Sequence, residues 1–168
     1  MIKKIFIPAF LLVVFISCKK DSSELMTANA SAQASGHALP FKGSFTTVNT
    51  ILVSPPNMEQ SVVGTGTATF LGSCTFVAMT NVTVSGTPPF AVNGTKTFTA
   101  ANGDQLFTSF TGTSGPIAPN VTQANLHEVI TGGTGRFENA SGSFETTAIA
   151  DQVTPRFTAD MEGTIKLK

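Results

Sequence analysis

Residues 155–167 read PRFTADMEGTIKL, and apolar or small side chains alternate strictly with polar ones along this stretch. The first set is Phe157, Ala159, Met161, Gly163, Ile165 and Leu167, and the second is Arg156, Thr158, Asp160, Glu162, Thr164 and Lys166. Successive side chains of a β-strand point to opposite faces, so a period of two predicts a strand with one buried and one solvated face. A strand of this kind needs neighbours that enclose its apolar side.

Seven segments upstream have the composition of strands, because Thr, Val and Phe dominate them and Gly or Pro interrupts the intervals between them. With the last stretch they make eight candidate strands: 41–48, 61–71, 73–84, 95–101, 104–112, 121–131, 141–150 and 155–167. Asn102-Gly103 predicts a type I′ hairpin, since both residues tolerate the positive φ of that turn. Longer Pro-bearing connections are expected at 54–60, 85–94 and 113–120.

A series of antiparallel strands leaves two exposed edges unless the sheet closes, and closure removes both edges. Eight strands is also about the number that closes around packed side chains or one small ligand. We therefore expect an all-β domain over residues 41–168, built as an eight-stranded antiparallel barrel. A two-sheet β-sandwich is the alternative.

The start of the chain has the pattern of an export signal. Lys3 and Lys4 precede the apolar run Ile5–Ile16, which has the length of a signal-peptide core and is short for a membrane span. The following Phe15-Ile16-Ser17-Cys18 resembles the lipobox of bacterial lipoproteins, although the family usually has Leu where Phe15 stands. An ordinary secretory signal that happens to contain a cysteine is the alternative.

The lipoprotein resemblance implies that residues 1–17 are a signal peptide and that Cys18 is lipidated. Two or three acyl chains on one residue would hold the protein on a membrane, since a single chain binds only marginally. We expect a cell-envelope protein that partners the membrane through this anchor, on the outer rather than the inner membrane, periplasmic or surface-exposed. Residues 18–40 are rich in Ser, Ala, Asn and Thr without a sustained period, which predicts a flexible tether after the lipidated cysteine.

The run from Ile130 to Phe144, ITGGTGRFENASGSF, is similar to a Gly-rich segment of the allene-oxide-cyclase and dirigent barrels. The match covers about fifteen residues, and the eight-strand order agrees more loosely over the rest. The resemblance implies a barrel with an apolar cavity. It does not imply a reaction, because counterparts of the family's polar site residues cannot be placed and Tyr is absent.

The Gly-rich run also has a structural interpretation. Glycine permits positive φ and a close approach of two backbones, as a sharp corner between strands requires. We expect Phe137 to face the core beside this corner. The predicted turn residues are Gly132, Gly133, Gly135, Phe137 and Gly142.

Composition excludes several functions. Charged residues make up 12% of the chain, the formal net charge is zero, and no basic block exists beyond the leader, so nucleic-acid binding is not expected. No metal site, cofactor or catalytic residue is predicted, and no protein partner can be named. Cys74 is the second of two cysteines and is expected to be a buried apolar residue. His127 and Glu128 are candidate polar groups in a cavity or at its mouth, on opposite faces of one strand.

Three functions remain open. The favoured one is a non-catalytic, lipid-anchored barrel that binds a small apolar ligand, for which we expect a lumen lined by Phe, Val and Met. An allene-oxide-cyclase-like isomerase or cyclase would require a polar cluster in the lumen, for which His127 and Glu128 are the candidates. A surface interaction or structural module would have a solid core.

Overall fold

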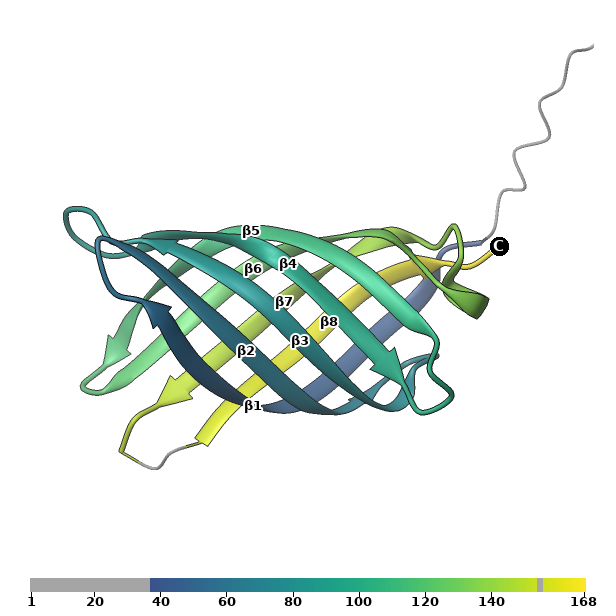
Figure 1. The fold of residues 1–168 in the computed structure, drawn as a ribbon, viewed down its shortest axis with the longest axis horizontal. Helices are drawn as coiled ribbons and strands as arrows, with labels where there is room; N and C mark the ends of the chain where they lie inside the picture. Colours follow the sequence, from purple (N-terminus) through teal and green to yellow (C-terminus); the bar gives the residue numbers. More distant parts are fainter. Residues whose placement is uncertain (1–36, 154–155) are drawn as a thin grey trace, which may run out of the picture. The chain divides into compact units, whose positions relative to one another are not determined.

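The computed structural model describes residues 37–153 and 156–168, and strands make up most of this part of the chain. The strands are β1 (Leu39–Val53), β2 (Asn57–Ala68), β3 (Gly72–Thr83), β4 (Phe90–Ala100), β5 (Gln105–Ala118), β6 (Val121–Gly133), β7 (Ser141–Asp151) and β8 (Arg156–Lys166). Each strand pairs antiparallel with the next, and β8 pairs with β1 to close the sheet (Figure 1). The predicted eight-stranded antiparallel barrel is confirmed, and the sandwich alternative is wrong.

The predicted signal peptide, Cys18 and the tether as far as residue 36 lie outside the described residues. Among the residues that the structure describes, no helix has the length and apolarity needed to cross a membrane.

The strands extend further than the sequence predicts at one end of the barrel. β2 begins at Asn57, β4 begins at Phe90 and β5 continues to Ala118, so the three predicted long connections are wrong in their extent. The prolines at 113–120 had predicted a connection where β5 in fact continues to Ala118. Pro116 lies beside a register shift in the β5–β6 pairing, and proline is tolerated at such an irregularity because the ladder is already interrupted there.

The hairpin at Asn102-Gly103 exists, but its turn is not type I′. Only Gly103 has a positive φ, of 89°, and its N–H donates to the Ala100 carbonyl over 2.9 Å. The Asn102 side chain instead accepts a hydrogen bond from the N–H of Asp104 at 3.2 Å. This local Asn bond favours a longer loop over the two-residue turn.

Glycine and phenylalanine face each other across the strands inside the barrel. Gly64 pairs with Phe76 and Gly163 pairs with Phe144 in the register of the sheet. A Cβ atom on Gly64 would lie 2.2 Å from an atom of the Phe76 ring, which is closer than non-bonded atoms approach. The rings therefore fill the space that the missing side chains leave.

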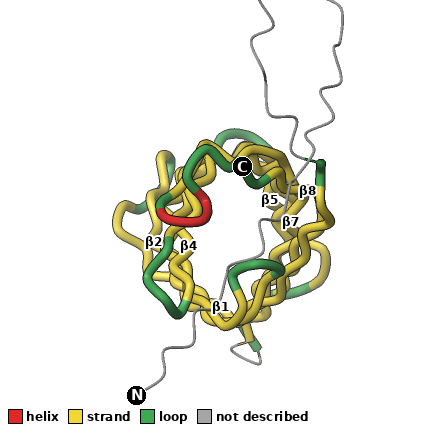
Figure 2. The backbone as a smooth tube through the Cα atoms, turned by 90° about the vertical axis from the view of Figure 1, so that its right-hand side faces the viewer, coloured by secondary structure: helices red, strands yellow, loops and turns green. Residues whose placement is uncertain are grey.

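The end of the barrel where β1 begins and β8 ends is filled by the hydrophobic core, and we call it the closed end. Figure 2 looks onto this end, where the short 3₁₀-helix η1 (Gly135–Phe137) lies at the rim. Completely buried side chains here include Phe41, Phe98, Phe137, Leu106 and Ile165. The Phe41 and Phe144 rings are 4.7 Å apart between centroids, within the range of favourable aromatic pairs.

The barrel has the attributes of a domain that folds by itself. All eight strands are paired along both edges, and the buried apolar residues of the core lie between Phe41 and Ile165. A closed sheet around its own hydrophobic core meets the physical requirements of an independent domain.

Candidate functional site

A cavity of about 430 Å³ occupies the half of the barrel opposite the closed end. We call the end where it opens the mouth; the β1–β2, β3–β4 and β5–β6 connections, the end of β7 and the start of β8 lie there (Figure 1). Most of the lining comes from inward-facing strand residues: Thr47, Asn49, Ile51, Met58, Gln60, Val62, Phe76, Ala78, Thr80, Val82, Val92, Lys96, Phe110, Ser114, Thr122, Ala124, Leu126, Thr146, Ala148, Ile149, Ala150, Gln152, Phe157, Thr158 and Ala159. The volume lies in the range of small-molecule sites.

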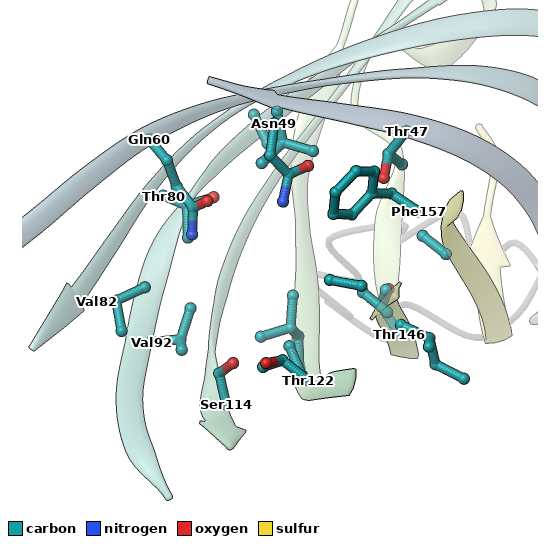
Figure 3. A pocket seen from close by; sticks show the side chains of 18 of the residues that line it. Thr47, Asn49, Gln60, Thr80, Val82, Val92, Ser114, Thr122, Thr146 and Phe157 are labelled. Carbon is teal, nitrogen blue, oxygen red and sulfur yellow. The ribbon is translucent and has the colours of Figure 1, made fainter. Parts of the chain in front are cut away.

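The walls of the cavity combine apolar side chains with uncharged polar ones. Figure 3 shows the amides of Asn49 and Gln60 pointing into the space from one wall, and the hydroxyl-bearing Ser114 and Thr122 on another. Lys96 is the only charged residue among the described residues that line the cavity. A site of this composition suits an apolar molecule with few polar atoms.

Lys96 on β4 and Glu128 on β6 form an ion pair in the interior of the barrel. Their side chains are only 4% and 0% exposed. The Lys96 Nζ also lies 4.8 Å from the centroid of the Phe76 ring and 5.5 Å from the centroids of Phe98 and Phe110. Aromatic faces attract a cation, so these rings stabilise the ammonium where water is excluded. Lys96, Phe76 and Phe110 also line the cavity, so the aromatic core and the cavity adjoin at this point.

Glu128 receives hydrogen bonds from three side chains. Lys96 donates to Oε1, the Thr146 hydroxyl donates to Oε1 at 2.6 Å, and the Thr108 hydroxyl donates to Oε2 at 2.9 Å. Charged groups are tolerated in a protein interior when they are paired and hydrogen-bonded in this way. Both carboxylate oxygens are thus engaged by neighbours, and Glu128 does not line the cavity.

Glu128, which the sequence suggested as a polar group of a cavity or its mouth, is an interior residue that does not line the cavity, and Lys96 was not predicted. A signal for Lys96 was present, since it shares the inward phase of β4 with Val92 and Phe98 while Thr95 and Thr97 take the outer face. A lysine in the apolar phase of a strand predicts a buried charge that needs a partner. Its partner lies 32 residues away on a strand that is not adjacent, and local periodicity carries no information about that pairing.

His127 does not belong to the cavity or to its mouth, so that prediction is wrong. It lies on the outer face of β6, where its side chain is 52% exposed and its Nδ1 is 2.6 Å from Oε1 of Glu145. The expectation that His127 and Glu128 face opposite ways is confirmed, because the strand alternation that buries Glu128 turns its neighbour outward.

Cys74 and the acidic residues of β8 lie away from the cavity. Cys74 is buried in the core as predicted, and burial raises the pKa of its thiol despite an opposing backbone hydrogen bond involving Ala68. Asp160 and Glu162 lie on the exposed face of β8, where Glu162 is 2.7 Å from Lys42. Within the described part of the chain, acidic, histidine and cysteine side chains do not gather in a group that could hold a metal ion.

The Gly-rich residues lie at the closed end, away from the cavity. Gly132, Gly135 and Gly142 have φ values of 133°, 56° and 137°, in the region that other residues rarely adopt. A Cβ on Gly133 would lie 2.2 Å from the Gln105 carbonyl oxygen. The corner that they form carries Phe137, which is fully buried, into the closed end of the barrel.

Comparison with known proteins adds no relative to this picture. No protein-family model matches the chain, and no curated protein and no solved structure matches it significantly.

Proposed function

We propose that this protein is a lipid-anchored, non-catalytic barrel of the bacterial cell envelope that binds a small apolar molecule. The observation that carries the proposal is the cavity, whose lining is mostly aliphatic and aromatic and has one charged member. The lipobox-like sequence at Cys18 supports the anchor. The similarity of residues 130–144 to the allene-oxide-cyclase and dirigent barrels supports an apolar lumen.

The mouth is suited to the entry of an apolar molecule. Ile51, Ile117 and Val153 near the mouth are 63%, 58% and 69% exposed. The segments 84–90 and 114–121, which contain two of the connections there and the adjoining strand ends, have no charged residue. An apolar ligand approaching this end therefore meets little charged surface whose hydration must be disrupted.

The test compares a substitution that fills the cavity with a substitution on the outer face of the same strand, which serves as the control. Ala148 on β7 lines the cavity, whereas its neighbour Thr147 is exposed on the outer face. We expect Ala148→Phe to abolish binding of the apolar fluorophore 1-N-phenylnaphthylamine to the barrel domain, because the ring occupies the ligand's space. Thr147→Phe should bind it like the wild type. Native mass spectrometry of the purified domain would look for a co-purified molecule.

Equal fluorophore binding by wild type and Ala148→Phe would contradict the proposal, because the dye would then lie elsewhere. The matched position of Thr147 controls for a new exposed or partly exposed phenylalanine on β7.

An isomerase or cyclase of the allene-oxide-cyclase type is the second candidate. The Lys96–Glu128 pair favours it, since a polar cluster inside the lumen is what such an enzyme requires. Against it, Glu128 already accepts from Lys96, Thr108 and Thr146, which leaves it poorly placed to accept a substrate proton. Incubation of the domain with an unsaturated fatty-acid allene oxide tests this candidate. A cyclised product with the same enantiomeric ratio as the uncatalysed product would exclude it.

A further inference from the structure

We propose that the cavity selects neutral apolar molecules that carry a hydrogen-bond-accepting oxygen, a carbonyl above all, and that the Lys96 ammonium donates to this oxygen. The inference deepens the proposed ligand-binding function and rests on it. It assigns Lys96 as the residue that determines ligand class.

The ammonium group of Lys96 has more hydrogen-bond donors than its neighbours accept. A lysine side chain carries three N–H donors, and among the described residues its one hydrogen-bond acceptor is Glu128. The surrounding faces of Phe76, Phe98 and Phe110 attract the positive charge but offer no lone pair. Lys96 lines the cavity together with Phe76 and Phe110, so an oxygen entering the cavity is the acceptor that these donors can reach.

The charge balance of the pair selects a neutral oxygen over a carboxylate. Glu128 already compensates the charge of Lys96, and the hydroxyls of Thr108 and Thr146 hold the carboxylate in place. A ligand carboxylate would bring a second negative charge into a site with one cation and would lose its hydration there. A ketone, aldehyde or ester accepts the hydrogen bond without adding charge.

The position of Lys96 fixes the orientation of the ligand. Phe98, two residues further along the inner face of β4, belongs to the closed-end core, whereas Val92 lies on the mouth side and lines the cavity. The polar end of the ligand therefore lies deep, and its hydrocarbon part runs past Val62, Val82 and Leu126 toward the mouth.

Three probes of equal chain length separate the alternatives: 2-octanone, octanoate and 1-octene. Each is used to displace 1-N-phenylnaphthylamine from the wild-type barrel domain and from the double variant Lys96→Met/Glu128→Leu, which replaces the ion pair by apolar side chains. The matched control is Lys42→Gln/Glu162→Gln, which removes an ion pair on the outer surface.

We expect octanone affinity to fall by about tenfold in the interior double variant, since a hydrogen bond from a charged donor is lost. Octene affinity should change by less than about twofold, because van der Waals contacts alone hold it. The surface variant should bind all three probes like the wild type, and octanoate should bind the wild type more weakly than octanone does. Tighter binding of octanoate than of octanone, or an equal loss for octanone and octene, would overturn the inference.

A ¹³C chemical-shift measurement on the wild type tests the hydrogen bond to the ligand without using the double variant. The ¹³C resonance of carbonyl-labelled 2-octanone should move downfield on binding to the wild type, relative to its position in an alkane solvent, because the carbonyl accepts a hydrogen bond. An alkane-like resonance for bound octanone overturns the assignment of Lys96 and leaves the ligand-binding function standing. Failure of the fluorophore, octanone and octene all to bind overturns the proposed function itself.

Discussion

The proposed ligand recognition rests at the residue scale on the Lys96–Glu128 pair, whose net contribution to folding should be small. Both charges lose their hydration on burial, and the attraction between them offsets this loss only when geometry and further hydrogen bonds are favourable. Two threonine hydroxyls and three aromatic rings provide such support here. An apolar pair of similar volume would fill the same space without these requirements, so the presence of an ion pair at this depth agrees with the proposed role in ligand recognition.

Removing one partner should therefore lower the free energy of unfolding more than removing both partners does. We expect Lys96→Met alone to lower the free energy of unfolding by about 3–5 kcal/mol, because Glu128 is left in the interior without its partner. The double variant Lys96→Met/Glu128→Leu should have a free energy of unfolding close to that of the wild type, or higher by about 1–4 kcal/mol. Urea unfolding followed by circular dichroism measures both.

The exposed ion pair of Lys42 and Glu162 is the control for these single and double variants of the buried pair. Their side chains are 66% and 73% exposed, so Lys42→Met should change the unfolding free energy by about 1 kcal/mol or less. A double interior variant as unstable as Lys96→Met alone would show that the pair supports the fold in a way that apolar side chains cannot replace.

Cys74 should make stability depend on pH in the alkaline range. Burial raises the pKa of its thiol in the folded barrel, whereas the thiol of the unfolded chain keeps its ordinary pKa of about 8.5. Below that pH both states hold the proton. Above it the unfolded chain releases its proton first, so stability falls as pH rises toward the folded pKa. We expect the wild type to lose stability between about pH 8 and 10 relative to Cys74→Ala, whose side chain does not titrate.

Chemical unfolding of both proteins at several pH values measures this difference. All other titratable groups are the same in the two proteins and cancel, so parallel curves would show that the Cys74 thiol titrates alike in the folded and unfolded states.

At the scale of the strand, periodicity predicted what depends on local alternation. It placed β8 correctly, since Ala159, Met161 and Ile165 are buried and Asp160 and Glu162 are exposed. Proline and glycine marked where the chain turns, but they did not show how far the ladders continue. Hydrogen bonding to neighbouring strands extends β5 through Pro116, and this requires knowledge of the partner strand.

The candidate site was predicted less completely than the fold because it is made by strands that are distant in the sequence. The apolar lining followed from the composition of the strands. The meeting of Lys96 on β4 with Glu128 on β6 follows from closure of the barrel around its axis, and no local pattern encodes it. His127 was misplaced for a related reason, since the sequence alone did not say which face of β6 turns inward.

The glycines of the inner face are a second feature at this scale. Gly64 on β2 makes room for the Phe76 ring, so Gly64→Ala places a methyl group where the ring lies. Overpacking of this kind costs about 1–3 kcal/mol of unfolding free energy. Thr65→Ala, on the exposed face of the same strand, should change it by about 0.5 kcal/mol or less.

Shrinking the ring should rescue the first variant if contact with Phe76 is the cause. We expect Gly64→Ala/Phe76→Leu to be more stable than the sum of the two single effects, by thermal or urea unfolding. Strict additivity would place the cost in the backbone of β2 instead.

For the whole molecule, the two ends of the barrel differ, because one is filled with side chains and the other opens into the cavity. The closed end holds the aromatic core, the Gly-rich corner and the point where the chain enters β1 at Leu39. The mouth opens at the other end, among exposed aliphatic residues. Because the chain enters the barrel away from the mouth, an attachment N-terminal to Leu39 is compatible with a cavity that stays open to ligand.

The anchor itself can be tested with the two cysteines of the chain, Cys18 and Cys74. Lipidation at a lipobox requires the sulfur of its cysteine, so in a bacterial host the wild type and Cys74→Ala should incorporate alkynyl palmitate, and Cys18→Ser should not. Cys18→Ser should also retain the mass of residues 1–17, since cleavage follows lipidation in bacterial lipoproteins. Mass spectrometry and click labelling of the isolated protein report both. Because one acyl chain binds a membrane only marginally, the wild type should carry at least two. An unlabelled wild type that begins after residue 17 would identify an ordinary secretory signal, and the ligand-binding barrel would then act without a membrane anchor.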